Sequence, residues 1–164
     1  MLRCSSYRRD RGTAIHIILT ETLQAALRGE GQVAITANLA PQVHAGGFFL
    51  PQQISIEACL LNQASEPAKD CIHLGQILKL SANTAHNLPA VEVTIPKLAA
   101  DGYTLALLTH ITVFGPHRLG PGDSGLTCPV LLREVRASDS PAIVRFTYQR
   151  GARPRFDWQM RSGS

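Results

Sequence analysis

The chain has 164 residues, of which 17% are charged and 45% are hydrophobic. This composition indicates one globular domain and excludes a disordered chain, and no apolar run is long enough to predict a transmembrane helix. The net charge of +4 belongs to the ends, because residues 1–12 and 150–164 each carry four arginines and one aspartate, whereas residues 13–149 carry a net −2. A nucleic-acid-binding protein is expected to carry its basic patch on the folded body, so no nucleic-acid partner is predicted.

The charge pattern suggests three segments. We predict a basic flexible N-terminus over residues 1–12, a single domain over residues 13–149 and a basic C-terminal tail over residues 150–164, whose last four residues resemble a cloning linker. The basic ends are interpreted as solubilising, with weak attraction to anionic lipid headgroups as the alternative. No secretion signal is predicted, because the apolar run over residues 14–19 is short, contains a histidine and precedes no small-residue cleavage site.

The first third of the chain gives mixed signals. Apolar residues recur at spacings of three and four over residues 13–29, which favours a helix, although a strand over residues 14–20 is the alternative. Residues 33–39 then alternate between apolar and polar or small side chains, which predicts a strand. Gly46-Gly47 indicates a turn, and the apolar residues 48–51 are expected in a loop.

Two further segments predict a hairpin. Apolar and polar side chains alternate over residues 53–60, and residues 71–80 read as the returning strand. The polar connection between them, residues 62–70, contains a proline.

A short and a long strand follow. Val91, Val93 and Ile95 alternate with polar residues up to a proline, and Asp101-Gly102 then supplies turn chemistry. Residues 103–114 form the longest predicted strand, with apolar odd positions interrupted only by a threonine. We expect the two strands to be the central pair of the fold.

The last part of the chain is a turn-rich loop over residues 115–125 and two strands over residues 127–135 and 142–148. Short strands separated by frequent turn signals predict an all-β fold, namely a two-sheet antiparallel β-sandwich of about seven to eight strands, with or without a short N-terminal helix.

The most tempting catalytic motif is Gly122-Asp123-Ser124-Gly125, which matches the nucleophile loop of trypsin-like serine proteases, while Thr84-Ala85-His86 echoes their histidine segment. A triad needs serine, histidine and aspartate at one cleft. His86 and Ser124 stand too close in sequence for the two-barrel protease fold. We therefore expect a surface loop and no enzyme, and a serine hydrolase using Ser124 and His86 is kept as a second alternative.

No metal or cofactor site is predicted. The six histidines form no HExxH motif and no zinc-type pairing, and no nucleotide-binding glycine pattern occurs. Cys71-Ile72-His73 puts two potential ligands on one strand face, but we see no second pair in the sequence that would complete a site.

Two cysteines and one apolar stretch remain as candidate features. Cys59 and Cys71 flank the 62–70 connection almost symmetrically, so they could face each other across the hairpin, either as a disulfide or as two thiols. Phe48, Phe49 and Leu50 are either an edge plug under the sandwich or a patch that binds a partner.

The order of these segments resembles a known family. FLPQQISIEACLLNQASEPAKDCIHLGQILKL (49–80), followed by VEVTIP (91–96) and DGYTLALLTHI (101–111), is similar to the small β-sandwich lipoprotein domain of the YbaY/YscW type. The resemblance covers roughly residues 31–135. This group includes pilot proteins (pilotins) for the secretins of type III secretion systems, ExsB among them.

The resemblance implies a non-catalytic lipoprotein at the periplasmic face of the bacterial outer membrane. Such a protein would assist the localisation or assembly of its partner, the secretin ring, without a cofactor. Its lipid anchor is not expected within these residues, because Leu2-Arg3-Cys4 lacks the small residues and hydrophobic run of a lipidation site. A ligand-binding β-sandwich, whose residues 48–50 line a pocket, is the alternative function.

Overall fold

The computed structural model describes residues 14–64 and 71–162. This part of the chain forms ten strands, one α-helix and four short 3-10 helices. The strands are β1 (Ile15–Leu19), β2 (Val43–Leu50), β3 (Gln53–Asn62), β4 (Cys71–Ser81), β5 (Val91–Ile95), β6 (Tyr103–Phe114), β7 (His117–Leu119), β8 (Val130–Val135), β9 (Ala142–Gln149) and β10 (Arg155–Ser162). The helices are η1 (Ala25–Leu27), α1 (Gln32–Leu39), η2 (Ala40–Gln42), η3 (Gly125–Thr127) and η4 (Ala137–Asp139).

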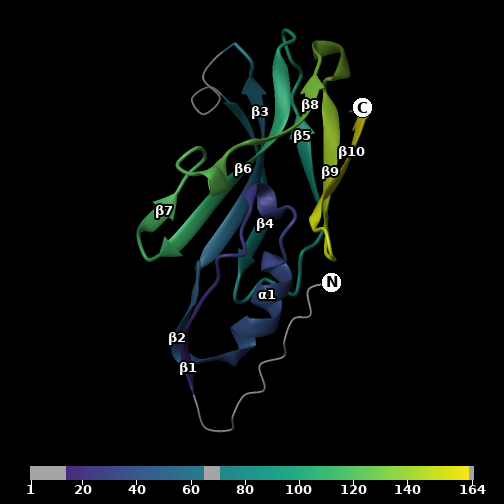
Figure 1. Cartoon of the computed structure of the whole chain (residues 1–164). Coiled ribbons are helices and arrows are strands. Elements are labelled where there is room, and N and C mark those ends of the chain that lie inside the picture. The colour runs from purple at the N-terminus through teal and green to yellow at the C-terminus, as the bar shows by residue number, and fades with distance from the viewer. Residues whose placement is uncertain (1–13, 65–70, 163–164) are drawn as a thin grey trace.

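The strands form two antiparallel sheets that pack face to face (Figure 1). The larger sheet has the order β4-β3-β6-β7, with β8 also paired to β6, and the smaller sheet has the order β10-β9-β5. A separate two-stranded parallel sheet, β1 and β2, lies with α1 at one end of the sandwich. The predicted all-β sandwich is confirmed.

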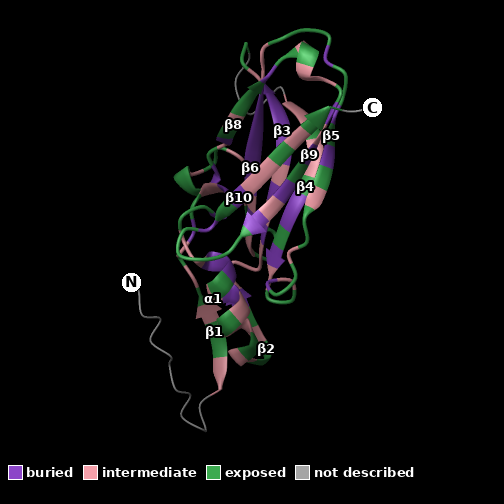
Figure 2. Ribbon diagram, turned by 90° about the vertical axis from the view of Figure 1, so that its right-hand side faces the viewer, coloured by how far each residue is buried: buried purple, intermediate pink, exposed green. Residues whose placement is uncertain are grey.

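The core of the molecule is built around β6. Residues 104–109 are all buried. The odd positions Leu105, Leu107 and Ile111 join the core between the sheets, whereas Ala106 and Leu108 join a smaller cluster on the outer face of the larger sheet. Figure 2 shows that buried residues concentrate in the strands of the two main sheets and that β1 and β2 are largely exposed. The long central strand is thus confirmed.

The expected pairing of β5 with β6 is wrong. β5 pairs with β9 in the smaller sheet, and β6 pairs with β3, β7 and β8 in the larger one. The Asp101-Gly102 segment therefore carries the chain from one sheet to the other. Both strands contribute apolar residues to the same core, so their sequence pattern cannot distinguish neighbours in one sheet from strands that face each other.

The predicted helix over residues 13–29 is wrong, and so is the predicted strand over residues 33–39. The first region holds β1, the strand alternative, and the short η1, whereas the helix is α1. The apolar side chains of so short a segment fit both the period of a helix and the period of a strand, and here tertiary contacts decide which of the two forms. The buried residues of α1 are Gln32, Val33 and Thr36, which share one helical face.

The first turn of α1 is fixed by the buried side chain of Gln32. Its Nε2 donates hydrogen bonds to Thr20 Oγ1 at 2.8 Å and to Thr36 Oγ1 at 3.2 Å, and its Oε1 accepts one from Thr22 Oγ1 at 2.9 Å. A strand through residue 32 would break this network and leave a buried amide without partners, which costs several kcal/mol.

Three further predictions need correction. The turn at Gly46-Gly47 and the loop over residues 48–51 are replaced by β2, which continues to Leu50. The turn-rich loop over residues 115–125 contains β7, paired to β6. The basic tail over residues 150–164 is not a tail, because residues 155–162 form β10 and pair with β9 along their whole length. The predicted flexible N-terminus, residues 1–12, lies outside the described residues, as does the end of the resembled cloning linker.

The segment η1 depends on the rest of the fold for its conformation. Ala26 and Leu27 have φ of 53° and 54°, a left-handed backbone that costs L-residues roughly 1–2 kcal/mol each. The buried hydroxyl of Thr109, the threonine that interrupts the apolar face of β6, accepts a hydrogen bond from the Ala26 amide at 2.9 Å. Tyr148 donates its hydroxyl proton to the Leu27 carbonyl oxygen at 2.8 Å. Both bonds hold η1 against the end of the sandwich.

Replacing Thr109 with valine should therefore destabilise the protein by about 1–3 kcal/mol, because the isosteric side chain leaves the buried Ala26 amide without an acceptor. Urea unfolding measures the change. Thr94→Val, at an exposed position of β5, is the matched control and should change the free energy of unfolding by less than about 0.5 kcal/mol. Equal effects of the two substitutions would contradict this role of Thr109.

Candidate functional site

An exposed apolar surface extends from the small parallel sheet to the end of β6. Ile17 and Leu19 of β1 are 61% and 74% exposed, and Phe48 of β2 and Phe114 of β6 are 42% and 43% exposed. Ile17 is the register partner of Phe48, whose ring meets that of Phe114 edge to face at a centroid distance of 5.1 Å. We call these four residues the β1–β2 patch. Large apolar side chains gathered in this way are typical of an interaction surface.

The sheet that carries the patch depends on a glycine. β1 and β2 pair in parallel with an irregularity between Ile15 and Ile17, and at that point Gly47 lies so close to the His16 carbonyl oxygen that a Cβ would overlap it. No third strand joins this sheet in the described ranges. Isolated two-stranded sheets are marginal in water, so the pair is an open platform to which another chain could add.

The predicted patch over residues 48–50 is only partly exposed. Phe48 faces solvent, Phe49 is buried and Leu50 is half-buried, as expected for successive residues of a strand. Ile17 and Leu19 were not predicted from the sequence, although two large apolar residues at a spacing of two in the alternative strand over residues 14–20 are a signal that would have found them. Phe114 was not predicted either, because only the fold brings it next to Phe48.

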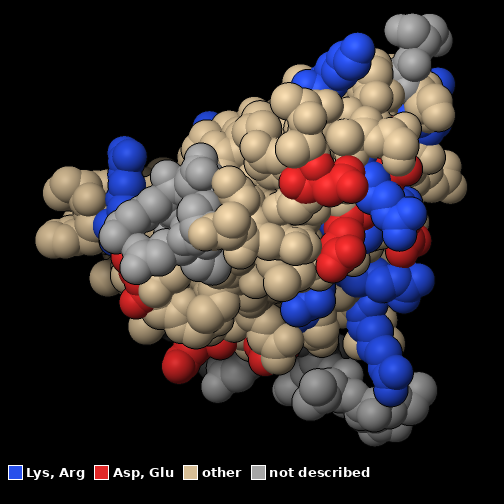
Figure 3. Space-filling model, turned by 90° about the horizontal axis from the view of Figure 1, so that it is seen from above, with Lys and Arg blue, Asp and Glu red and all other residues tan. Residues whose placement is uncertain are grey.

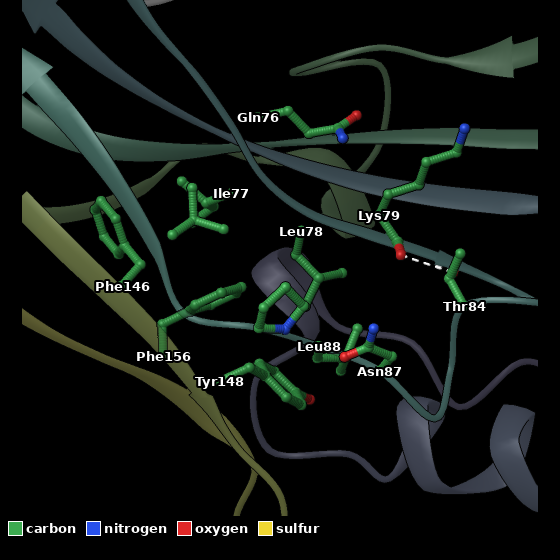
Figure 4. Close-up of a pocket in the computed structure, with 12 residues that line it drawn as sticks. Gln76, Ile77, Leu78, Lys79, Thr84, Asn87, Leu88, Phe146, Tyr148 and Phe156 are labelled. Carbon is green, nitrogen blue, oxygen red and sulfur yellow. Dashed lines mark hydrogen bonds between the residues drawn. The ribbon is translucent and has the colours of Figure 1, made fainter.

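A cleft opens between the edges of the two main sheets (Figure 4). It lies where the edge strands β4 and β5 diverge, and its volume is about 240 Å³. The floor is apolar and the rim carries polar side chains from β4 and the loop that follows it. The floor residues include Ile77, Leu78, Leu88, Val91, Phe146, Tyr148 and Phe156, and the rim residues are Gln76, Lys79, Thr84 and Asn87.

The size of this cleft limits its ligands. Small-molecule sites usually measure roughly 300–1,000 Å³, and an apolar cavity of roughly 150 Å³ holds benzene. The cleft of about 240 Å³ therefore accommodates one or two apolar side chains or a small aromatic ligand.

Polar side chains form a connected group on the outer face of the larger sheet. The Cys71 sulfur lies 3.3 Å from His73 Nε2, and His73 Nδ1 lies 2.8 Å from Glu57 Oε1. The second carboxylate oxygen of Glu57 lies 3.4 Å from His110 Nε2. An open polar groove of about 520 Å³ beside Glu57 and His110 is also lined by Arg118. Glu57 and His110 were missed, although Glu57-Ala58-Cys59 repeats the i, i+2 spacing of Cys71-Ile72-His73 on the neighbouring strand.

Cys59 and Cys71 belong to this group, but their geometry differs from the prediction. Two irregularities in the β3–β4 pairing place Cys59 opposite His73 and Cys71 opposite Leu61, so the cysteines are diagonal neighbours. No disulfide joins them in the structure. Burial, and secondarily the nearby Cys71 and Glu57, raise the pKa of the Cys59 thiol to about 12. Cys59 is thus a neutral thiol at physiological pH.

Ser124 has a local structural contact. Its hydroxyl accepts a hydrogen bond from the Leu126 amide at 3.2 Å and caps η3. Its carbonyl oxygen accepts bonds from Thr127 and Cys128. His86 is exposed in the loop after β4, and no hydrogen bond joins it to Ser124 within the described part of the chain. The structure does not bring the two residues of the serine-hydrolase alternative into contact.

Acidic and basic side chains pair on the smaller sheet. Arg161 of β10 pairs with Glu92 of β5 at 3.2 Å, and Arg155 pairs with Asp157 within β10 at 2.9 Å. Figure 3, the view from above, shows acidic and basic side chains next to one another on one side of the molecule.

Among the residues placed by the structure, no helix has the length and apolarity to cross a membrane. Comparison with protein-family models and with curated proteins found no match to this chain.

Proposed function

We propose that this protein is a non-catalytic binding protein of the secretin-pilot kind, which acts at the periplasmic face of the bacterial outer membrane. Its partner is a secretin subunit, which it holds through an apolar segment docked on the β1–β2 patch. The observation that carries the proposal is the solvent exposure of Ile17, Leu19 and Phe48 on one small open sheet, together with the exposed Phe114 of β6, whose ring meets that of Phe48.

Two features of the patch favour a protein partner over a small ligand. The sheet that carries Ile17, Leu19 and Phe48 projects at one end of the sandwich, and aromatic residues such as Phe48 and Phe114 are common anchors of protein interfaces. The sheet also has strand edges with unpaired backbone groups, to which an extended segment of a partner can add by β-augmentation. The family resemblance of residues 31–135 supplies the secretin as the partner class.

Leu19→Ser and Phe48→Ser are expected to weaken binding to the purified secretin at least tenfold while leaving the fold intact, because both side chains are exposed. Binding is measured by titration with the full chain. Leu131→Ser is the matched control, since Leu131 is 63% exposed on β8, outside the patch. In cells, the patch variants should fail to restore secretin multimers to a deletion strain, and the control should restore them.

Unchanged secretin binding in both patch variants would overturn the patch as the docking site. Unchanged secretin multimers in the outer membrane after deletion of the gene would overturn the pilot role itself.

The cleft supports ligand binding as the second candidate function, although residues 48–50, which were expected to line the pocket, do not line this cleft. Its apolar floor and polar rim fit a small aromatic molecule. Val91→Trp, which places a larger side chain in the cleft, would then abolish binding of a fluorescent probe such as anilinonaphthalene sulfonate, and the patch variants would retain it. The two functions are therefore separable by the same set of proteins.

A further inference from the structure

Cys71 lies next to a base that is itself held by a carboxylate. Its sulfur is 3.3 Å from His73 Nε2, and the opposite ring nitrogen, Nδ1, is 2.8 Å from Glu57. When Glu57 accepts the Nδ1 proton, the lone pair of Nε2 faces the thiol and can take its proton. This order of nucleophile, base and orienting carboxylate activates thiols in proteins.

The second thiol of the group stands in the right place to react afterwards. Cys59 is fully buried on β3, and Cys71 is its diagonal neighbour on β4. Cys71 is half-buried and His73 is exposed, so a reagent from solvent meets Cys71 and not Cys59. The pair thus has one accessible and one protected thiol, which is the usual arrangement of an attacking and a resolving cysteine.

We propose that Cys71 is a nucleophilic thiol that reacts with low-molecular-weight disulfides, and that Cys59 resolves the product into a Cys59–Cys71 disulfide. This inference is independent of the docking function, because the thiols lie on the outer face of the larger sheet and not in the β1–β2 patch.

The reaction has two steps. In the first, His73 takes the Cys71 proton, the Cys71 sulfur bonds to one sulfur of the disulfide, and the other leaves as a thiolate that recovers the proton. In the second, the Cys59 sulfur attacks the Cys71 sulfur and displaces the second small molecule as a thiolate, which takes up the proton that Cys59 gives up. Overall, two protein thiols are oxidised and one disulfide is reduced to two thiols.

The neighbouring groove favours a small polar disulfide as the reagent. It is lined by Gln53, Ser55, Thr112 and Arg118, and it reaches Glu57, the residue that orients His73. Peptide-like disulfides such as glutathione disulfide carry carboxylates and amides that suit a guanidinium and neutral hydrogen-bonding groups.

The test is incubation of the reduced full chain with glutathione disulfide, followed by quenching and peptide mass spectrometry. Cys71 should react about tenfold or more faster than Cys128, which is exposed and whose thiol donates to the Ser124 carbonyl oxygen. The final product should be the Cys59–Cys71 disulfide. Cys59→Ser should stop at the mixed disulfide on Cys71, with a mass gain of one glutathione.

His73→Gln should slow the reaction of Cys71 to about the rate of Cys128, and it should not affect folding because His73 is exposed. Circular dichroism of each variant checks the fold. Equal rates at Cys71 and Cys128 in the unsubstituted chain would overturn the activated thiol. A wild-type product that remains a mixed disulfide would overturn the resolving role of Cys59.

Discussion

Replacing Phe146 with alanine is expected to lower the free energy of unfolding by about 3–5 kcal/mol. Phe146 is 1% exposed in β9, the central strand of the smaller sheet. Its ring meets Phe156 of β10 edge to face at 6.4 Å, and its register partner in β5 is Val91. The substitution removes contacts between the sheets and enlarges the cleft that Phe146 lines. Since domains of this size are stable by roughly 5–15 kcal/mol, the loss is a large share of the total.

Urea unfolding measures this loss, and the single tryptophan, Trp158, is a suitable probe because it pairs with Phe146 across the β9–β10 ladder. Leu131→Ala serves as the control, because Leu131 is a large apolar residue at an exposed position. Its effect should stay within about 0.5 kcal/mol. A loss below about 1 kcal/mol for Phe146→Ala would show that the ring does not hold the sheets together.

Alkaline pH is expected to destabilise the protein by about 4 kcal/mol between pH 8 and pH 11. Burial raises the pKa of Tyr148 to about 12 from 10.0, and it raises the pKa of Cys59 to about 12 from 9.0. In both cases the folded state holds its proton at pH values where the unfolded chain has released it. The stabilisation is therefore complete below the unfolded pKa values and is lost as the pH rises through 9 and 10 toward 12.

Two variants separate these contributions, measured by urea unfolding at a series of pH values with a thiol reductant. Cys59→Ala should remove the larger part of the alkaline loss, roughly 3 kcal/mol, and Tyr148→Phe roughly 1 kcal/mol. Tyr148→Phe should also lower stability at neutral pH by about 1 kcal/mol, since the Leu27 carbonyl loses its donor. A pH dependence that is the same in all three proteins would contradict the assignment.

The three regions with chemical or binding potential lie on different surfaces. The β1–β2 patch is at one end of the sandwich, the cleft opens between the sheet edges, and the thiol group lies on the outer face of the larger sheet. The substitutions that test the three regions are at different residues. A negative result for one region therefore leaves the proposals for the other two unaffected.

The sequence by itself determined the strands that face the core. Period-two alternation located β3, β5, β6 and β9, because one buried face imposes that spacing on a strand, and β4 was predicted as the strand that returns after the polar connection. It also indicated Phe48 as a surface candidate and the proximity of Cys59 and Cys71, which follows from the short connection between two paired strands.

Tertiary structure decided the elements whose local signals conflict. α1 forms at residues with strand-like alternation because Gln32 finds three hydroxyl partners, and η1 takes a left-handed backbone because Thr109 and Tyr148 bond to it. β10 has the composition of a basic tail, yet it pairs with β9 because that edge of the smaller sheet offers backbone partners.

The candidate sites were likewise completed only by the fold. The irregularities in the β3–β4 ladder place Cys59 opposite His73 and diagonal to Cys71, whereas the closeness of the Cys71 sulfur to the His73 imidazole follows from their spacing of two on β4. Glu57 of β3 lies next to His110 of β6 only in the folded sheet. Phe114, the last residue of β6, likewise meets Phe48 of β2 only in the folded structure. Such contacts depend on register and sheet order, which are set by long-range packing and not by the residues next to each site.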